Sequence, residues 1–465
     1  MSELAKKTKK PFGFYVCCIS YMFERMAYYS AKYLVFVFIT ATVITGGLGL
    51  TKVQAALVQS NLVAFTYLAP VIGGYISDRW IGARYCVPTG VALMGIGYWV
   101  GSSAQGLVGM NTMVALIAVG TGLFKGNLAA MSGALFADQE ELDAAFSTQY
   151  SFINIGAFIG TTLVGILVTK TFAANGVQGF RQAFKVCAAI CALDFAWIVF
   201  GMRFLGDVGK KPFKAGKNLE EQEEVKEAKP LTKSEKKRTA AIIIVSLFSI
   251  VFWVFWYLTY LAAYDYGGTF INMNINNFQI PLSWFDSLNS MTCIILGPLL
   301  GILWAKLAKR PQGDMSLFKK LAFGLVFLGI AFLMLVFAEF TRGVGAPETA
   351  KASLGWLVAF GVLLTIGEMF FSPLGSSFVT KYAPNKIFSV LMGIWFFATF
   401  FAGKSYGYIY AITSKFSPIV SYSVIPAVLF VCAVLLFAFE KKLKALLDED
   451  DVKESSSVVL EEKAL

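Results

Sequence analysis

Hydrophobic residues recur in long uninterrupted runs along this chain of 465 residues. Runs such as 85–100, 240–255 and 317–337 approach or exceed the roughly 20 residues that cross a hydrocarbon core of about 30 Å. No water-soluble core requires runs of this length. The pattern therefore predicts an all-α polytopic membrane protein.

Twelve segments are predicted to span the membrane, in two sets of six. The first set lies near 12–43, 53–77, 84–103, 111–134, 144–170 and 181–205, and the second near 239–265, 284–307, 317–340, 352–381, 387–412 and 418–440. The predicted domains are a cytoplasmic N-terminus (1–11), an N-terminal six-helix bundle (12–205), a linker (206–238), a C-terminal six-helix bundle (239–440) and a cytoplasmic tail (441–465). The linker is rich in glutamate and lysine, so we expect a cytoplasmic connection that is helical in part. The end of the tail is acidic and is expected to be disordered.

Composition and charge support this class. Hydrophobic residues make up 57% of the chain and charged residues 15%, against roughly a quarter charged in soluble domains. The net charge of +11 could suggest a nucleic-acid partner, but lysines gather near the N-terminus and in 210–238, 306–310 and 441–444. Loops such as 102–111 and 267–283 carry few charges, which is the positive-inside pattern. We therefore expect both termini in the cytoplasm, a plasma-membrane location (the inner membrane in a bacterium) and no nucleic-acid partner.

Residue types that commonly carry enzyme chemistry are sparse. The chain has no histidine, and its seven cysteines show neither a CxxC pair nor metal-ligand spacing. We interpret them as small apolar side chains. Neither a P-loop nor a nucleophile–base set is present. The sequence therefore predicts no enzyme activity, no metal site and no cofactor, and any proton chemistry falls to carboxylates, lysine or tyrosine.

The loop after the second predicted span contains Gly74, Asp78, Arg79, Gly82 and Arg84, here called the gate motif. It resembles G-x-x-x-D-R-x-x-G-x-R, the cytoplasmic signature of the major facilitator superfamily, whose fold is twelve transmembrane helices in two six-helix bundles. The glycines would allow a tight turn, and Asp78 can pair with a basic residue or a helix N-terminus at an inward gate. The alternative is an ordinary charged loop between helices. The resemblance implies a substrate site at the interface of the two bundles, near the midplane.

Ionisable side chains also interrupt the apolar spans. Glu24 and Arg25 lie in the middle of the first span, with Tyr29 on the same helical face as Arg25. Charges at that depth are costly and normally face a cavity, although an adjacent Glu–Arg pair can also serve packing alone.

Three later spans each carry one more such polar residue. Lys125 is either a buried charge facing a cavity or an interfacial side chain that reaches the membrane surface. Asn154 could bind a substrate or hold helices together. Glu368 is a lone carboxylate in a helix broken by Pro373 and Gly375, where freed backbone groups can line a cavity.

Together these motifs resemble the proton-dependent oligopeptide transporter family. Its span-one pattern, E-x-x-E-R-F-x-Y-Y, is matched by Glu24, Arg25, Tyr28 and Tyr29. The other matches are Tyr67-Leu68-Ala69-Pro70, Phe124-Lys125-Gly126-Asn127, Tyr150 with Asn154, Gly156 and Phe158, Phe285 with Ser287, Leu288, Asn289 and Pro298, Gly367-Glu368 with Ser372-Pro373, and Met392-Gly393-Ile394-Trp395. The resemblance covers about residues 12–412, and the order and spacing of the motifs are more specific than any single motif.

The resemblance implies a role for each of these side chains. Arg25 and Lys125 would hold the carboxylate of a peptide, and Asn154, Asn289 and Glu368 would hold its amino group. The pocket would be lined by Tyr28, Tyr29, Tyr67 and Trp395. Opposite charged poles suit a zwitterion whose side chains vary, and pairing offsets the desolvation of each ion.

Two positions depart from the family pattern. Tyr21 stands where the first glutamate of the span-one motif is expected, and Tyr257 stands where an acidic residue usually occurs in span seven. A tyrosine has a reference pKa of about 10 and stays protonated at neutral pH. Three interpretations stay open: Glu24 and Glu368 carry the proton, coupling is lost, or another carboxylate substitutes, such as Asp194, Asp265 or Asp286.

The sequence thus predicts a secondary active transporter that imports di- and tripeptides. We expect proton symport with alternating access, in which peptides and protons are the partners and the monomer is the functional form in the lipid bilayer. One alternative is a carrier of another small organic ion with lost or altered proton coupling, which the two missing carboxylates favour. Another is a peptide-binding sensor with a transporter fold.

Overall fold

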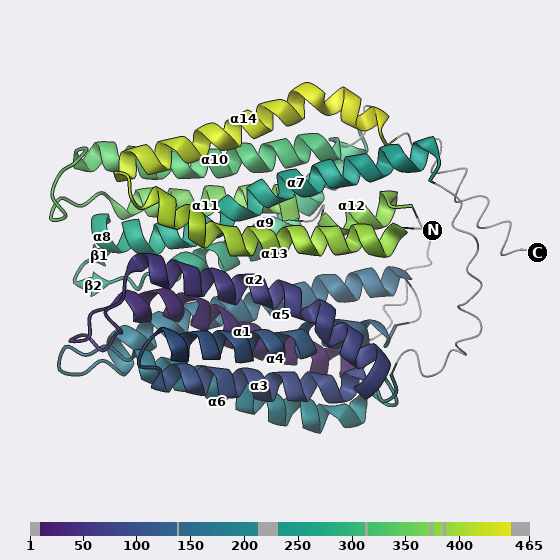
Figure 1. Ribbon diagram of the computed structural model, residues 1–465, viewed down its shortest axis with the longest axis horizontal. Helices are drawn as coiled ribbons and strands as arrows, with labels where there is room; N and C mark the ends of the chain where they lie inside the picture. The colour runs from purple at the N-terminus through teal and green to yellow at the C-terminus, as the bar shows by residue number, and fades with distance from the viewer. Residues whose placement is uncertain are drawn as a thin grey trace, which may run out of the picture. The chain divides into compact units, whose positions relative to one another are not determined.

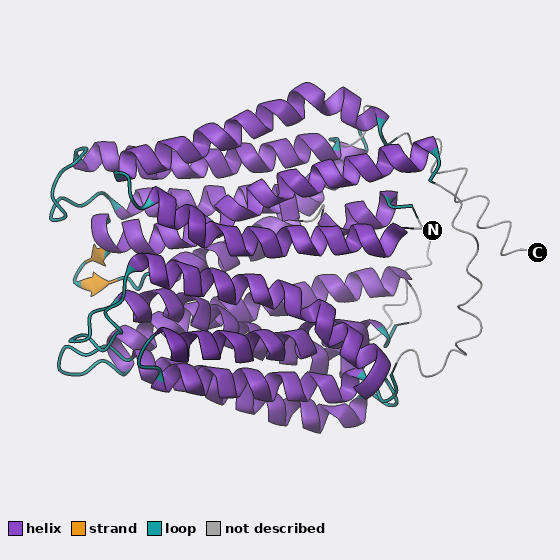
Figure 2. Ribbon diagram, viewed as in Figure 1, coloured by secondary structure: helices purple, strands orange, loops and turns teal. Residues whose placement is uncertain are grey.

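The computed structural model describes residues 10–136, 139–212, 231–311, 315–372, 375–384 and 387–447. Most of these residues lie in helices, and the others form the connecting loops and two short strands (Figure 2). The chain divides into two compact units, Met1–Asn218 (unit 1) and Leu219–Leu465 (unit 2). Residues 213–230 of the predicted linker and the predicted disordered tail at 448–465 lie outside the described residues.

The described part of unit 1 is built on six long helices. They are α1 (Phe12–Thr40), α2 (Lys52–Ile76), α3 (Ala83–Ser103), α4 (Leu107–Gly133), α5 (Gln139–Ile166) and α6 (Phe180–Gly201). Short turns extend three of them, namely η1 (Ser77–Ile81) after α2, η2 (Leu167–Thr171) after α5 and η3 (Met202–Phe204) after α6. The main neighbours are α3 with α4 and α6, α2 with α4, and α1 with α5 and α6 (Figure 1).

Glycines set the closest helix contacts in unit 1. A Cβ atom at Gly73 on α2 would lie 2.0 Å from the carbonyl oxygen of Gly122 on α4. A Cβ atom at Gly156 on α5 would lie 2.2 Å from the carbonyl oxygen of Met22 on α1. Helices in a membrane gain little from hydrophobic association and depend on such close packing. These glycines therefore allow α2 to pack closely against α4, and α5 to pack closely against α1.

Unit 2 carries the remaining long helices. Its elements are α7 (Lys233–Ala262), η6 (Ala263–Gly267), α8 (Gly268–Phe270), β1 (Asn274–Ile275), β2 (Phe278–Gln279), α9 (Trp284–Ala308), α10 (Leu317–Arg342), α11 (Leu354–Phe371), α12 (Gly375–Tyr382), α13 (Phe388–Thr413) and α14 (Pro418–Ala445). The main neighbours are α10 with α11 and α14, α7 with α13, and α9 with α11. Strands β1 and β2 pair antiparallel, with Asn274 opposite Gln279.

The prediction of a twelve-span helical membrane protein is confirmed. Nine helical segments in the described ranges are long and apolar enough to cross a membrane by length and composition. The other three long helices that complete the twelve spans are α1, α3 and α13, and in α1 the charged residues Glu24, Arg25 and Lys32 lower the hydropathy. The predicted tenth span comprises two helices, α11 and α12.

One helix begins earlier than its apolar pattern indicates. The sequence places the seventh span from residue 239, but α7 starts at Lys233. A capping box explains the difference, because Thr232 and Glu235 each accept a hydrogen bond from the other's backbone N–H. The first turns of α7 are therefore charged.

Candidate functional site

The middle of α1 holds the Glu24–Arg25 pair. Glu24 is only 1% exposed, and its two carboxylate oxygens accept hydrogen bonds from Arg25 Nε and Nη2, the latter at 2.6 Å. The guanidinium also lies over the rings of Tyr28 and Tyr29, at 4.6 and 5.9 Å from their centroids. Each buried charge thus compensates the other, which offsets the cost of removing both from water.

Lys125 of α4 lies near this pair. Its Nζ is 4.6 Å from the ring centroid of Tyr67 on α2, and its charge interacts with those of Arg25 and Glu24. The hydroxyl of Tyr21 donates a hydrogen bond of 2.5 Å to the backbone oxygen of Lys125. These contacts favour a lysine held among the helices of unit 1 over one that reaches the membrane surface.

Two other predicted site residues of unit 1 have local partners. The hydroxyl groups of Tyr28 and Thr66 share a hydrogen bond of 3.3 Å between α1 and α2. The half-buried Asn154 donates a hydrogen bond of 2.9 Å to the carbonyl oxygen of Tyr150, one turn earlier on α5. The role of Asn154 in binding stays a prediction.

In unit 2, α9 and α11 bring Asn289 and Glu368 together. The amide Nδ2 of Asn289 donates to Glu368 Oε2 at 2.9 Å and to Thr365 Oγ1 at 3.0 Å, while Tyr260 donates to Asn289 Oδ1 at 3.3 Å. Glu368 is 9% exposed. An amide donor orients a carboxylate without neutralising its charge, so this arrangement suits the binding of a cation.

Two partners of Asn289, Thr365 and Tyr260, were not found from the sequence. Thr365 lies three residues before Glu368 and therefore on the same helical face, which is a signal that the sequence does carry. Tyr260 comes from α7, and nothing in the sequence relates its position to that of Asn289 on α9.

Tyr257 and Trp395 both lie buried in unit 2. The ring of Tyr257 on α7 packs 5.2 Å from that of Trp256 and 5.5 Å from that of Tyr406 on α13. The tyrosine that replaces the expected acidic residue is therefore part of an aromatic contact between α7 and α13.

Two of the other carboxylates considered from the sequence accept hydrogen bonds from tyrosines. Asp265 Oδ2 accepts from Tyr410 at 2.6 Å, and Asp286 Oδ2 accepts from Tyr264 at 2.5 Å. Both contacts join η6, the extension of α7, to a neighbouring helix of unit 2, namely α13 for Asp265 and α9 for Tyr264. They give these carboxylates a structural role in positioning α7.

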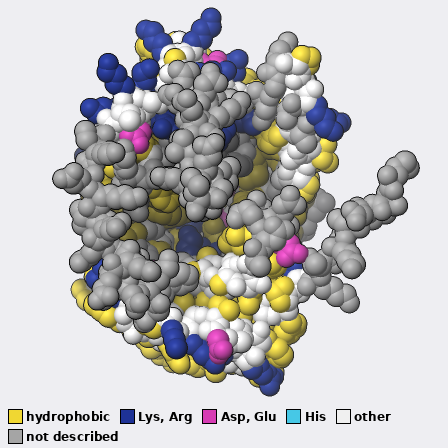
Figure 3. Space-filling model, turned by 90° about the vertical axis from the view of Figure 1, so that its right-hand side faces the viewer, with side chains coloured by type: hydrophobic (Ala, Val, Ile, Leu, Met, Phe, Trp, Pro, Cys, Tyr) yellow, Lys and Arg dark blue, Asp and Glu magenta, His cyan; other side chains and the backbone are white. Residues whose placement is uncertain are grey.

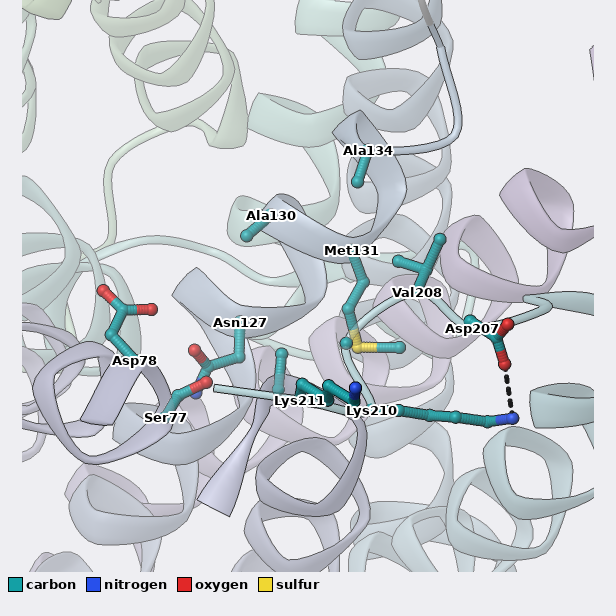
Figure 4. Close-up of a pocket in the computed structure, with 12 residues that line it drawn as sticks. Ser77, Asp78, Asn127, Ala130, Met131, Ala134, Asp207, Val208, Lys210 and Lys211 are labelled. Atoms are coloured by element: carbon teal, nitrogen blue, oxygen red, sulfur yellow. Dashed lines mark hydrogen bonds and ion pairs between the residues drawn. The ribbon is translucent and has the colours of Figure 1, made fainter. Parts of the chain in front are cut away.

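The gate motif borders a cavity of about 600 Å³ in unit 1 (Figure 4). The exposed Asp78 lines it together with Asn127 of α4 and residues 207–211, which follow α6. Lys210 donates a hydrogen bond of 2.6 Å to Asp207, and this bond lowers the pKa of the Asp207 carboxyl group. The motif thus faces the chain segment that leads out of unit 1.

Two residues of the gate motif, Gly82 and Arg84, contact the chain segment that follows α6. Gly82 has φ +83°, and a Cβ atom there would lie 2.8 Å from the carbonyl oxygen of Gly209, so only glycine suits the position. Arg84 donates from its backbone to Gly209 and from its side chain to the carbonyl oxygens of Met202 (2.5 Å) and Gly206.

The gate motif also contains Gly74 and Arg79. The prediction of a turn at Gly74 is wrong, because Gly74 lies inside α2, where the helix continues to Ile76. The Arg79 guanidinium lies 4.6 Å from the ring centroid of Tyr75.

Known proteins resemble this chain along most of its length. The model of the POT family matches residues 89–214 and 210–425. The peptide transporter YePEPT of Yersinia enterocolitica is 25% identical over 431 residues, which cover 82% of this chain and 84% of the relative. A di-/tripeptide transporter of Lactococcus lactis subsp. cremoris is 26% identical over 457 residues, covering 86% and 89%.

A solved structure shows the same fold. It is a POT family transporter in complex with 5-aminolevulinic acid, with a TM-score of 0.83 and 21% sequence identity. The alignment covers 93% of this chain and 97% of that protein.

Proposed function

The chain belongs to the POT family, and from this membership we propose that it imports di- and tripeptides by proton symport with alternating access. It is a multi-pass membrane transporter and not an enzyme. The observation that carries the proposal is the opposite charge of its two polar clusters. Unit 1 presents Arg25 and Lys125, and unit 2 presents Glu368 held by Asn289.

The chemistry of a peptide fits these clusters. Arg25 and Lys125 take the terminal carboxylate, and Glu368, with Asn289 and Asn154, takes the terminal ammonium group. Charge-assisted hydrogen bonds are stronger than neutral ones, so the two ends supply affinity that does not depend on the side chains. The aromatic rings that line the pocket in this proposal are Tyr28, Tyr29, Tyr67 and Trp395.

The proposed orientation follows from the basic residues. Lys210, Lys211 and Arg84 lie at the gate-motif end of unit 1, and Lys236 and Lys237 lie in the first turns of α7. Figure 3 shows Lys and Arg side chains gathered on the face where α7 begins. The positive-inside rule then supports a cytoplasmic position for both termini, in the plasma membrane or the inner membrane of a bacterium. We expect the monomer to be the functional form.

A second candidate function is transport of another small organic ion. The replacement of two expected carboxylates by Tyr21 and Tyr257 favours it. The 5-aminolevulinic acid bound to a structural relative also carries an amine and a carboxylate, as a peptide does. The charged clusters suit either ligand, so a transport assay is needed to tell the two candidate functions apart.

Counterflow in proteoliposomes tests the substrate class. Liposomes loaded with unlabelled dipeptide are expected to take up labelled dipeptide faster than empty ones, because exchange needs no net driving force. Peptides blocked at both termini should not compete. Binding without uptake would indicate a sensor, and competition by 5-aminolevulinic acid but not by dipeptides would indicate the second candidate.

A further inference from the structure

Asp194 is a buried carboxyl group that the proposed peptide contacts do not use. It lies on the face of α6 that packs against α1 and α3, and it is 0% exposed. Within the described part of the chain, neither of its oxygens has a hydrogen bond of ordinary geometry. The buried hydroxyl groups of Ser20 on α1 and Tyr98 on α3 also have no hydrogen bond of ordinary geometry to another described residue.

The groups around Asp194 do not supply a counter-ion. From α1 it faces Ser20 and Glu24, and Glu24 is itself bound by Arg25 through both carboxylate oxygens. On α6, Cys191 lies one turn before it, and Cys191 and Cys187 in turn face Tyr98 of α3. An ionised carboxylate in such surroundings is far more costly than a neutral carboxyl group, which needs only weak partners.

We propose that Asp194 is the proton-binding carboxyl group of unit 1, protonated in this conformation and linked to peptide binding through the Glu24–Arg25 pair. The inference rests on the proposed function and names the residue that couples it to protons. In the transport cycle the proton leaves to water in a conformation that admits water to Asp194, since water then solvates the ionised carboxylate. The carboxyl group is protonated again when water is excluded, as in the buried environment seen here.

Charge explains the link to the peptide. With Asp194 neutral, the cations Arg25 and Lys125 exceed the single carboxylate Glu24 by one positive charge, which attracts a peptide carboxylate. With Asp194 ionised, that excess disappears. Protonation and peptide binding therefore each favour the other, as symport requires. The proton then binds on α6, so a carboxylate is not needed at position 21, where this chain has a tyrosine.

The isosteric substitution Asp194→Asn tests the proposal, because asparagine keeps the shape and cannot exchange a proton. The wild type at neutral pH should show the infrared C=O stretching band of a protonated carboxyl group, and the variant should lack it. Dipeptide affinity of the wild type should fall as pH rises, while that of the variant should not change. The variant should also lose gradient-driven accumulation and keep counterflow.

Two further variants make the result decisive. Glu348→Gln, in an exposed loop, should behave as wild type. Asp194→Glu should keep a protonated-carboxyl band at a shifted frequency and keep the pH dependence, and it serves if the asparagine variant does not fold. An unchanged band, or wild-type pH dependence in Asp194→Asn, would overturn the proposal. If the band is lost as expected but the wild type moves no dipeptide, the proton site stands and the peptide function fails.

Discussion

Replacing Glu368 by glutamine is expected to abolish peptide uptake while the protein remains folded. Glutamine keeps the size of the side chain and can still accept the hydrogen bond from Asn289. The negative charge that we assign to the peptide ammonium group is lost. Removing one partner of a buried charge pair costs about 2–5 kcal/mol, and each 1.4 kcal/mol or so is tenfold, so affinity should fall by at least about thirtyfold.

Dipeptide binding by the purified variant and uptake in proteoliposomes both measure this effect. Glu235→Gln is the matched control, because glutamine serves equally well in the capping box at the start of α7. Uptake by Glu368→Gln at the rate of this control would show that the ammonium group binds elsewhere.

The second large effect is expected at Lys125. Methionine has a similar length and still packs against Tyr67, but it removes the charge that lies 4.6 Å from that ring. The variant Lys125→Met should lose at least about tenfold in affinity for peptides with a free carboxylate, since a charge-assisted contact contributes about 1.5–3 kcal/mol. Peptides amidated at the C-terminus should bind the variant and the wild type equally weakly.

Competition of labelled dipeptide by the free-acid and amidated forms of one peptide gives the comparison. Lys185→Met is the control, because this exposed lysine also lies over an aromatic ring, that of Trp99 at 5.7 Å. The assignment fails if Lys125→Met still prefers the free acid as strongly as Lys185→Met does.

The sequence predicted the spans well because a membrane leaves few options. Backbone polar groups in hydrocarbon must be satisfied within the segment, so a long apolar run has to be a helix. The same rule makes each interruption informative, and Glu24, Arg25 and Glu368 are buried as expected. The start of α7 was missed because its first turns are stabilised by a cap and not by apolar burial.

The partners of the site residues were less accessible to sequence reasoning. That Asn289 bonds Glu368 and Thr365 depends on how α9 packs against α11, which apolar periodicity does not specify. The surroundings of Asp194 likewise depend on the packing of α6 against α1 and α3. The sequence offered Asp194 as one of several carboxylates. It differs from the tyrosine-bonded Asp265 and Asp286 in that neither of its buried oxygens has a hydrogen bond of ordinary geometry to the described residues.

Tyr21 shows how a family position can change its chemistry. Its hydroxyl donates to the backbone oxygen of Lys125, and its ring packs 5.5 Å from that of Phe124. It therefore positions α4 against α1 at the point where the family motif has a carboxylate. A proton-coupled mechanism in this chain has to use a carboxyl group elsewhere.

Uptake of labelled dipeptide into proteoliposomes, with and without an inward proton gradient, tests the central claim most directly. Proton symport predicts transient accumulation above the outside concentration with the gradient, and simple equilibration without it. Equal uptake under both conditions, at the same rate and to the same level, would contradict proton-coupled import.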